Sequence, residues 1–175
     1  IKNFRDLATK MDKPGLDILY LLTTDKCNFS CKYCFIKNEM ASSYKFTTMN
    51  MNTLKKGVDF FSANLRDSGI SPSVIFYGGE PLMNSHAVTE GAKYVREKMP
   101  NVIMSLVSNG SRITKDIAKK LADADVYVAV SLDGTKEVND SARIFSKGRG
   151  TYDDAIKGCK ILKENGVDTG ISFTI

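Results

Sequence analysis

Three closely spaced cysteines are the residues of this sequence best suited to chemistry. Cys27, Cys31 and Cys34 stand four and three positions apart in the stretch CNFSCKYC. Three thiolates on one short loop can hold three irons of a cube-shaped iron–sulfur cluster and leave the fourth iron open. An open iron can chelate an amino and a carboxylate group. We therefore expect the rest of the chain to present a ligand of that kind.

A structural zinc site is the competing interpretation of the same cysteines. It requires four protein ligands, and only Cys159 and the sole histidine, His86, remain to complete the set. Neither has a local spacing to the triplet that is typical of zinc. Cys159 lies on one helix face with Ala155 and Leu162 and is predicted to be a small core residue, while His86 is predicted to be structural. The pattern therefore favours iron–sulfur chemistry.

The composition is that of an ordinary globular domain in a reducing compartment. Of the 175 residues, 42% are hydrophobic and 26% charged, and no apolar run approaches the ~20 residues that span a membrane. Because three of the four cysteines fall within eight residues, a disulfide framework is disfavoured and a cytoplasmic location is expected. The net charge is +5, but the lysines are scattered, so we expect no nucleic-acid partner.

Hydrophobic periodicity predicts strands that alternate with helices. Such alternation is typical of a parallel sheet with right-handed crossovers, in either an open doubly wound sheet or a barrel. Residues 1–15 are predicted to be a polar lead-in to a core domain at 16–175. The final apolar run, 170–175, resembles an unfinished strand, so we expect a longer protein. The predicted strands are 17–23, which is expected to be buried, 73–77, 102–107, 126–132 and one from about 168. The predicted helices are 50–66, 85–98, one capped by Thr114 and one capped by Thr151. A polar loop is predicted at 135–150.

Every unusual residue cluster follows the end of a predicted strand. The carboxyl ends of parallel strands meet at one rim, where ligands bind in both sheet types. We therefore expect four loops to converge there. They are the cysteine loop, Gly78-Gly79-Glu80-Pro81, Ser108-Asn109-Gly110 and Ser131-Leu132-Asp133-Gly134.

The clusters at this rim suit a ligand with ammonium and carboxylate groups. Paired glycines let the backbone approach a ligand closely, and the Glu80 carboxylate suits an ammonium. Ser131 and Arg143 could bind a carboxylate. Simple turns are the alternative for all of these motifs, with Asn109 in a left-handed turn conformation and Asp133 as a turn residue.

The cysteine motif with an aromatic residue before its third cysteine resembles the signature of the radical S-adenosylmethionine (SAM) enzymes. The resemblance is strongest to the branch that modifies peptides and proteins, which includes thioether-forming peptide maturases and anaerobic sulfatase maturases. It implies a partial (β/α)6 barrel, truncated here after about the fifth strand. It also implies that Cys27, Cys31 and Cys34 each bind one iron of a [4Fe–4S] cluster, whose fourth iron takes the amino and carboxylate groups of SAM.

The same resemblance assigns cofactor contacts to the other motifs. These are Tyr33 near the adenine; Gly78, Gly79 and Glu80 at the methionine amino group; Ser131 and Arg143 at its carboxylate; Ser108 and Asn109, from a motif similar to the family's Thr-Asn-Gly; and Asp133, as a contact or a turn residue. The family often has His-Asp where this chain has Asn139-Asp140. That departure leaves the substrate contacts of this loop open, and we assign no catalytic residue.

The implied activity is reductive cleavage of SAM to a 5'-deoxyadenosyl radical that abstracts hydrogen from a peptide or protein. An external one-electron donor of the flavodoxin or ferredoxin type is implied, and no membrane partner. Thioether formation in ribosomal peptide maturation is our first hypothesis, and formylglycine formation by a sulfatase maturase is the alternative. A non-catalytic iron–sulfur or zinc module is the alternative from a different class.

Overall fold

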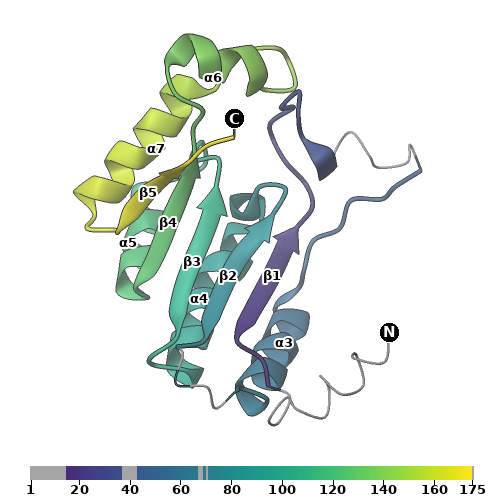
Figure 1. Ribbon diagram of the computed structural model, residues 1–175, viewed down its shortest axis with the longest axis vertical. Helices are drawn as coiled ribbons and strands as arrows, with labels where there is room; N and C mark the ends of the chain where they lie inside the picture. Colours follow the sequence, from purple (N-terminus) through teal and green to yellow (C-terminus); the bar gives the residue numbers. More distant parts are fainter. Residues whose placement is uncertain (1–14, 37–42, 67–68, 70, 175) are drawn as a thin grey trace, which may run out of the picture.

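A five-stranded parallel sheet forms the centre of the computed structural model, which describes residues 15–36, 43–66, 69 and 71–174 (Figure 1). The strands lie side by side in the order in which they occur along the chain, and each pairs in parallel with the next. A doubly wound sheet would reverse its order at a switch point. The order here is therefore that of a barrel wall. The strands are β1 (Ile18–Thr24), β2 (Ser73–Gly78), β3 (Ile103–Ser108), β4 (Val126–Ser131) and β5 (Thr169–Ser172).

Helices between the strands cover one face of this sheet (Figure 1). Asn50 begins α3 because its side-chain oxygen accepts a hydrogen bond from Thr53 N at 2.9 Å. Thr114 caps α5 in the same way through Ile117 N, as the sequence predicts. The helices are α3 (Met51–Ala63), α4 (Ser85–Lys98), α5 (Lys115–Asp123), α6 (Lys136–Ala142) and α7 (Tyr152–Glu164), with a 3-10 helix, η1 (Pro81–Asn84).

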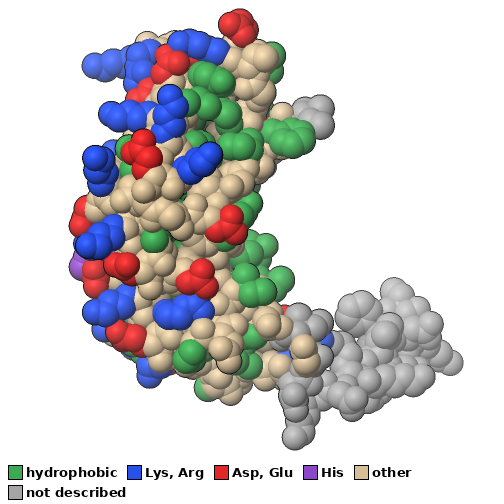
Figure 2. Space-filling view, turned by 90° about the vertical axis from the view of Figure 1, so that its left-hand side faces the viewer, with side chains coloured by type: hydrophobic (Ala, Val, Ile, Leu, Met, Phe, Trp, Pro, Cys, Tyr) green, Lys and Arg blue, Asp and Glu red, His purple; other side chains and the backbone are tan. Residues whose placement is uncertain are grey.

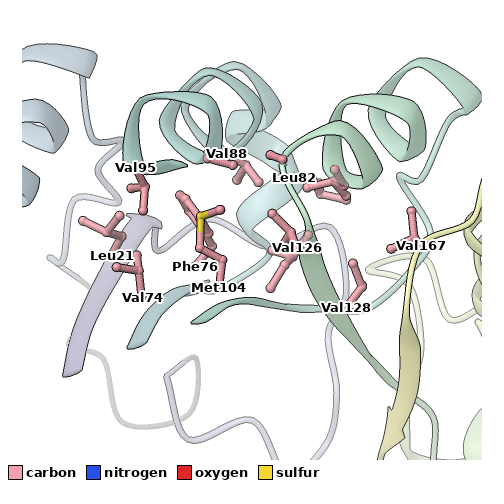
Figure 3. Close-up of a cluster of buried hydrophobic side chains, with 14 of the residues drawn as sticks. Leu21, Val74, Phe76, Leu82, Val88, Val95, Met104, Val126, Val128 and Val167 are labelled. Carbon is pink, nitrogen blue, oxygen red and sulfur yellow. The ribbon is translucent and has the colours of Figure 1, made fainter. Parts of the chain in front are cut away.

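The hydrophobic core lies between the sheet and the helices α3, α4, α5 and α7 (Figure 3). Alternate strand residues such as Phe76 and Leu106 point into it and are completely buried. Helix α3 packs here through an apolar stripe of residues four and three positions apart, Leu54, Val58 and Phe61. Cys159 on α7 packs against the edge of the same core, as predicted. The packed face of the sheet is therefore the face that the helices cover.

The other face of the sheet is open and apolar, and this corrects the prediction that 17–23 is a buried strand. Ile18, Tyr20 and Leu22 are 53%, 55% and 55% exposed. Figure 2 shows hydrophobic side chains along the hollow side of the molecule and charged side chains on the helix side. The strand is buried on one face only, because no described helix covers the other.

The predicted polar loop 135–150 is also wrong in part, since it contains α6. Thr151 begins α7, but its side chain does not make the predicted capping bond. Its hydroxyl donates instead to Arg143 O at 2.9 Å. Asp140 takes over the capping role by accepting hydrogen bonds from Thr151 N and Tyr152 N, both at 2.8 Å. In the part of the chain that the structure describes, no helix is long and apolar enough to cross a bilayer.

Candidate functional site

The cysteine loop begins where β1 ends and is packed against the segment around α6. Ser30 N donates to Ile144 O at 2.7 Å, and Lys32 N donates to Ala142 O at 3.0 Å. The buried Phe29 ring meets Phe145 edge to face, with 4.8 Å between ring centroids. These contacts fix the loop from residues more than a hundred positions away in the sequence.

The three cysteines of this loop are free thiols. Partial burial raises the pKa of Cys27 to about 11 and also raises the pKa of Cys31. A metal that binds the Cys27 and Cys31 thiolates therefore has to displace protons. Among the described residues, no three His, Cys, Asp or Glu side chains are grouped so that they could hold one metal ion. Within its described residues the loop thus contains no preformed single-ion site, whereas a cluster binds each thiolate at a different iron.

Two cavities meet at this loop. One, of about 410 Å³, is mainly apolar and includes Phe46 and Met83 in its lining together with Cys27 and Cys34. The other, of about 310 Å³, is bordered by residues at the ends of β2, β3, β4 and β5 and by the cysteine loop that follows β1. Most of the predicted site residues line this second cavity. They are Cys27, Cys31, Tyr33, Cys34, Gly78, Gly79, Ser108, Asn109, Ser131 and Arg143.

The paired glycines let the β2 turn pack against the base of the cysteine loop. A Cβ atom on Gly78 would lie 2.1 Å from Thr24 O, and one on Gly79 would lie 2.5 Å from the Asp25 and Lys26 carbonyl oxygens. Gly78 also has a φ of +145°, which side chains disfavour. The glycines are therefore required by the neighbouring chain, in addition to bordering the cavity.

Glu80 is completely buried, and its carboxylate does not line either cavity. Oε1 accepts hydrogen bonds from Leu82 N at 3.0 Å and Ser108 Oγ at 2.9 Å, and Oε2 accepts one from Asn109 N at 2.7 Å. Burial raises the pKa of Glu80, and these hydrogen bonds oppose the shift. The carboxylate therefore joins the β2 turn to the β3 turn.

Asn109 extends this connection to the cysteine loop. Its Nδ2 donates to Asn28 Oδ1 at 3.0 Å and lies 4.0 Å from the Cys27 sulfur. Its Oδ1 accepts hydrogen bonds from Ser111 N and Ser111 Oγ. The left-handed residue of this turn is Gly110, with a φ of +76°, and not Asn109 as the turn alternative proposed. Asn28, which sequence reasoning missed, completes the network through Ser111 Oγ.

Asp133 joins three loops through one buried carboxylate. Arg143 Nε donates to Oδ2 at 2.7 Å, and Thr174 N donates to Oδ1 at 3.0 Å. The Tyr33 hydroxyl also donates to Oδ2, and the Arg143 guanidinium lies 5.4 Å from the centre of the Tyr33 ring. Burial alone would raise the pKa of Asp133, but the hydrogen bonds from Arg143 and Tyr33 hold it below its ordinary value. Burial and Asp133 both raise the pKa of Tyr33.

Asn139 is a second residue of the site that sequence reasoning missed. It is completely buried on α6, where its Oδ1 accepts a hydrogen bond from Asp133 N at 3.3 Å. Its Nδ2 donates to Thr151 Oγ1 and Asp140 Oδ1. Asn139 therefore fixes the backbone at Asp133. No periodicity marks a polar residue of this kind, and its position in a predicted loop concealed it.

These features together define a parallel half-barrel whose strand ends surround three loop cysteines. Residues 21–175 match the family model described as the Radical SAM superfamily. The chain belongs to the radical SAM superfamily. Both the resemblance inferred from the cysteine motif and the predicted partial barrel are thereby confirmed.

Individual relatives match this chain over part of their own length. The Fe-coproporphyrin III synthase of Methanosarcina barkeri is 35% identical over 153 residues, covering 87% of this chain and 35% of that protein. The cysteine-type anaerobic sulfatase-maturating enzyme of Clostridium novyi is 27% identical over 161 residues, covering 90% of this chain and 43% of that protein. The solved structure of anSMEcpe with bound AdoMet and the Cp18Cys peptide has a TM-score of 0.74 and 25% sequence identity. The match covers 90% of this chain and 42% of that one. The chain therefore spans less than half the length of these three proteins.

The cofactors of this superfamily are SAM and an iron–sulfur cluster. The residues present fit both groups. Three thiols on one loop match a cluster with one open iron. Within the described residues, Arg143 uses only Nε for Asp133 while it lines the cavity, so its terminal nitrogens remain suited to a carboxylate.

Proposed function

We propose that this chain is the catalytic core, within residues 16–175, of a radical SAM enzyme that acts on a peptide or protein. The observation that carries the proposal is that Cys27, Cys31 and Cys34 border one cavity with Ser131 and Arg143. A sulfatase-maturating relative and a solved relative with a bound peptide support the substrate class.

The three cysteines would each hold one iron of a [4Fe–4S] cluster. When bound and reduced, the cluster supplies the electron that converts SAM to a 5'-deoxyadenosyl radical, which takes a hydrogen atom from the substrate. Arg143 and Ser131 would bind the SAM carboxylate, and the Gly78-Gly79 backbone would border its amino group. Tyr33 would lie near the adenine, and its hydroxyl donates a hydrogen bond to Asp133.

The open face of the sheet would form the inner wall of the reaction chamber. Its exposed side chains are mostly apolar, among them Tyr20, Leu22 and Ile171. An apolar wall excludes water from the chamber, which limits side reactions of reactive intermediates. The protein's contribution is therefore to orient the ligands and to exclude water.

Thioether formation in ribosomal peptide maturation remains our first hypothesis for the reaction, with formylglycine formation as the alternative. Thioether formation removes two hydrogens and keeps the sulfur, whereas formylglycine formation at a cysteine replaces the thiol with an aldehyde oxygen. Product mass therefore separates them. We also propose a cytoplasmic setting, which keeps the thiols reduced, and an external flavodoxin- or ferredoxin-type donor.

A tetrapyrrole substrate is the second candidate. It is favoured by the 35% identity to a relative named Fe-coproporphyrin III synthase. Offering the whole protein an iron tetrapyrrole in one reaction and a cysteine-containing peptide in another distinguishes the two. The true substrate class should increase deoxyadenosine formation above the substrate-free rate.

An anaerobic assay of the whole protein tests the proposal. Reconstituted protein with SAM and a strong reductant should release 5'-deoxyadenosine, and the triple variant with Cys27, Cys31 and Cys34 changed to Ala should release none. Equal cleavage by the triple variant would refute the assigned ligands. A wild-type protein that binds a cluster yet never cleaves SAM would support the non-catalytic module instead.

A further inference from the structure

The sulfur of Cys27 receives two N–H groups from the protein. Phe29 N donates from within the loop at 3.4 Å. Asn109 Nδ2, from the turn after β3, approaches to 4.0 Å. Hydrogen bonds to cluster sulfurs are among the factors that set the reduction potential. The second donor, Asn109, lies 82 positions from Cys27 in the chain. Other residues must therefore hold its side chain beside the Cys27 sulfur.

The Asn109 side chain is held by hydrogen bonds at both its oxygen and its nitrogen. Its side-chain oxygen is bound by Ser111 N at 3.0 Å and Ser111 Oγ at 2.7 Å, and its Nδ2 also donates to Asn28 Oδ1. Asn109 is only 6% exposed. These partners require the oxygen of the amide to face Ser111, so its nitrogen must face the cysteine loop.

Glu80 holds both ends of this arrangement. Its backbone N–H donates to Lys26 O at 2.8 Å, directly before Cys27. Its carboxylate accepts from Asn109 N at 2.7 Å. One buried residue thus fixes the chain that carries the first cysteine and the turn that carries the second donor. A carboxylate that is completely buried and accepts three hydrogen bonds is poorly placed to contact a ligand.

We propose that Asn109 is a positioning residue for Cys27, that Glu80 holds it in place, and that its amide raises the reduction potential of the cluster. This inference rests on the proposed cluster site. An N–H directed at a cluster sulfur stabilises the additional negative charge of the reduced state. Glu80 then acts through the protein, and the backbone of the glycine turn would border SAM.

The test uses the whole protein, reconstituted anaerobically without SAM, and measures iron content and midpoint potential by redox titration followed by electron paramagnetic resonance. Asn109→Ala should keep four irons and move the potential to a more negative value. Asn109→Asp removes the donor and adds a negative charge, so it should move the potential further in the same direction. Asn101→Asp is the matched control, because Asn101 is exposed in the turn before β3, at the opposite end of that strand. Its potential should equal the wild-type value.

The possible results test the role of Asn109 and the cluster assignment separately. Variants that retain four irons at the wild-type potential would overturn the inference while leaving the cluster assignment intact. Loss of iron with an unchanged circular dichroism spectrum of the metal-free protein would overturn the proposed effect on the potential, because it would make Asn109 necessary for cluster binding itself. Loss of that spectrum in both Asn109 variants would make Asn109 a folding residue and overturn the inference. A wild-type protein that binds no four-iron cluster would instead refute the proposed function.

Discussion

Removing the Asp133 carboxylate should destabilise the protein by about 3 kcal/mol. The Asp133 and Arg143 side chains are 5% and 10% exposed, with 2.7 Å between Oδ2 and Nε. Breaking a buried pair by deleting one partner costs roughly 3–5 kcal/mol because the other charge is left uncompensated. Arg143 borders a cavity, where water can solvate it, so we take the lower end of that range.

A double-mutant cycle with Asp133→Ala and Arg143→Ala separates the pair from its surroundings. Urea unfolding of the two single variants, the double variant and the wild-type protein gives the four free energies required. We expect the double variant to be about 2 kcal/mol more stable than the sum of the single losses predicts, since contacting residues couple by roughly 0.5–3 kcal/mol. Additive losses, or a cost below about 1 kcal/mol for Asp133→Ala, would refute the reasoning.

The same carboxylate predicts a pH dependence. Because the folded-state pKa of Asp133 lies below its ordinary value of 3.8, its contribution to stability is fully present above that value. It is lost as the pH falls through the folded pKa. The difference in unfolding free energy between the wild-type protein and Asp133→Asn should therefore be constant near neutral pH and should shrink below about pH 4.

Two further variants test the turn and the helix cap separately. Gly79→Ala should lower the iron content after reconstitution and leave the helical circular dichroism signal, because its Cβ would lie 2.5 Å from two carbonyl oxygens at the base of the cysteine loop; full iron content would contradict this. Asn50→Ala should cost about 1 kcal/mol in urea unfolding, the usual value of a lost N-cap, with iron content unchanged. A cap variant that loses iron would show that α3 supports the site.

Much of the fold could be predicted from the sequence, because apolar periodicity reports which face of an element is buried. The stripe of α3 illustrates this, with Leu54, Val58 and Phe61 all in the core. The helix α6 could not be predicted. Its one large apolar residue, Val138, is 57% exposed, and its buried residue is the polar Asn139. Its place in the site depends on hydrogen bonds to Asp133 and Thr151, which are tertiary.

The meeting of these motifs at one cavity was predictable from the sequence, while the contacts of individual side chains were less so. The carboxyl ends of parallel strands must meet, so the cysteine, glycine and serine motifs were expected at one rim. The side to which a residue points beyond a strand end follows no periodicity. For that reason Glu80 was assigned to a ligand although its carboxylate is enclosed by protein donors. The clash that makes Gly79 necessary is likewise visible only once β1 lies beside β2.

We propose that three cysteines hold a cluster with one iron free for SAM. The most direct measurement is the electron paramagnetic resonance spectrum of the reduced, reconstituted whole protein before and after SAM is added. We expect a four-iron signal that changes on addition of SAM and is absent when Cys27, Cys31 and Cys34 are replaced by Ala. A signal that ignores SAM, or one that survives the triple replacement, would contradict it.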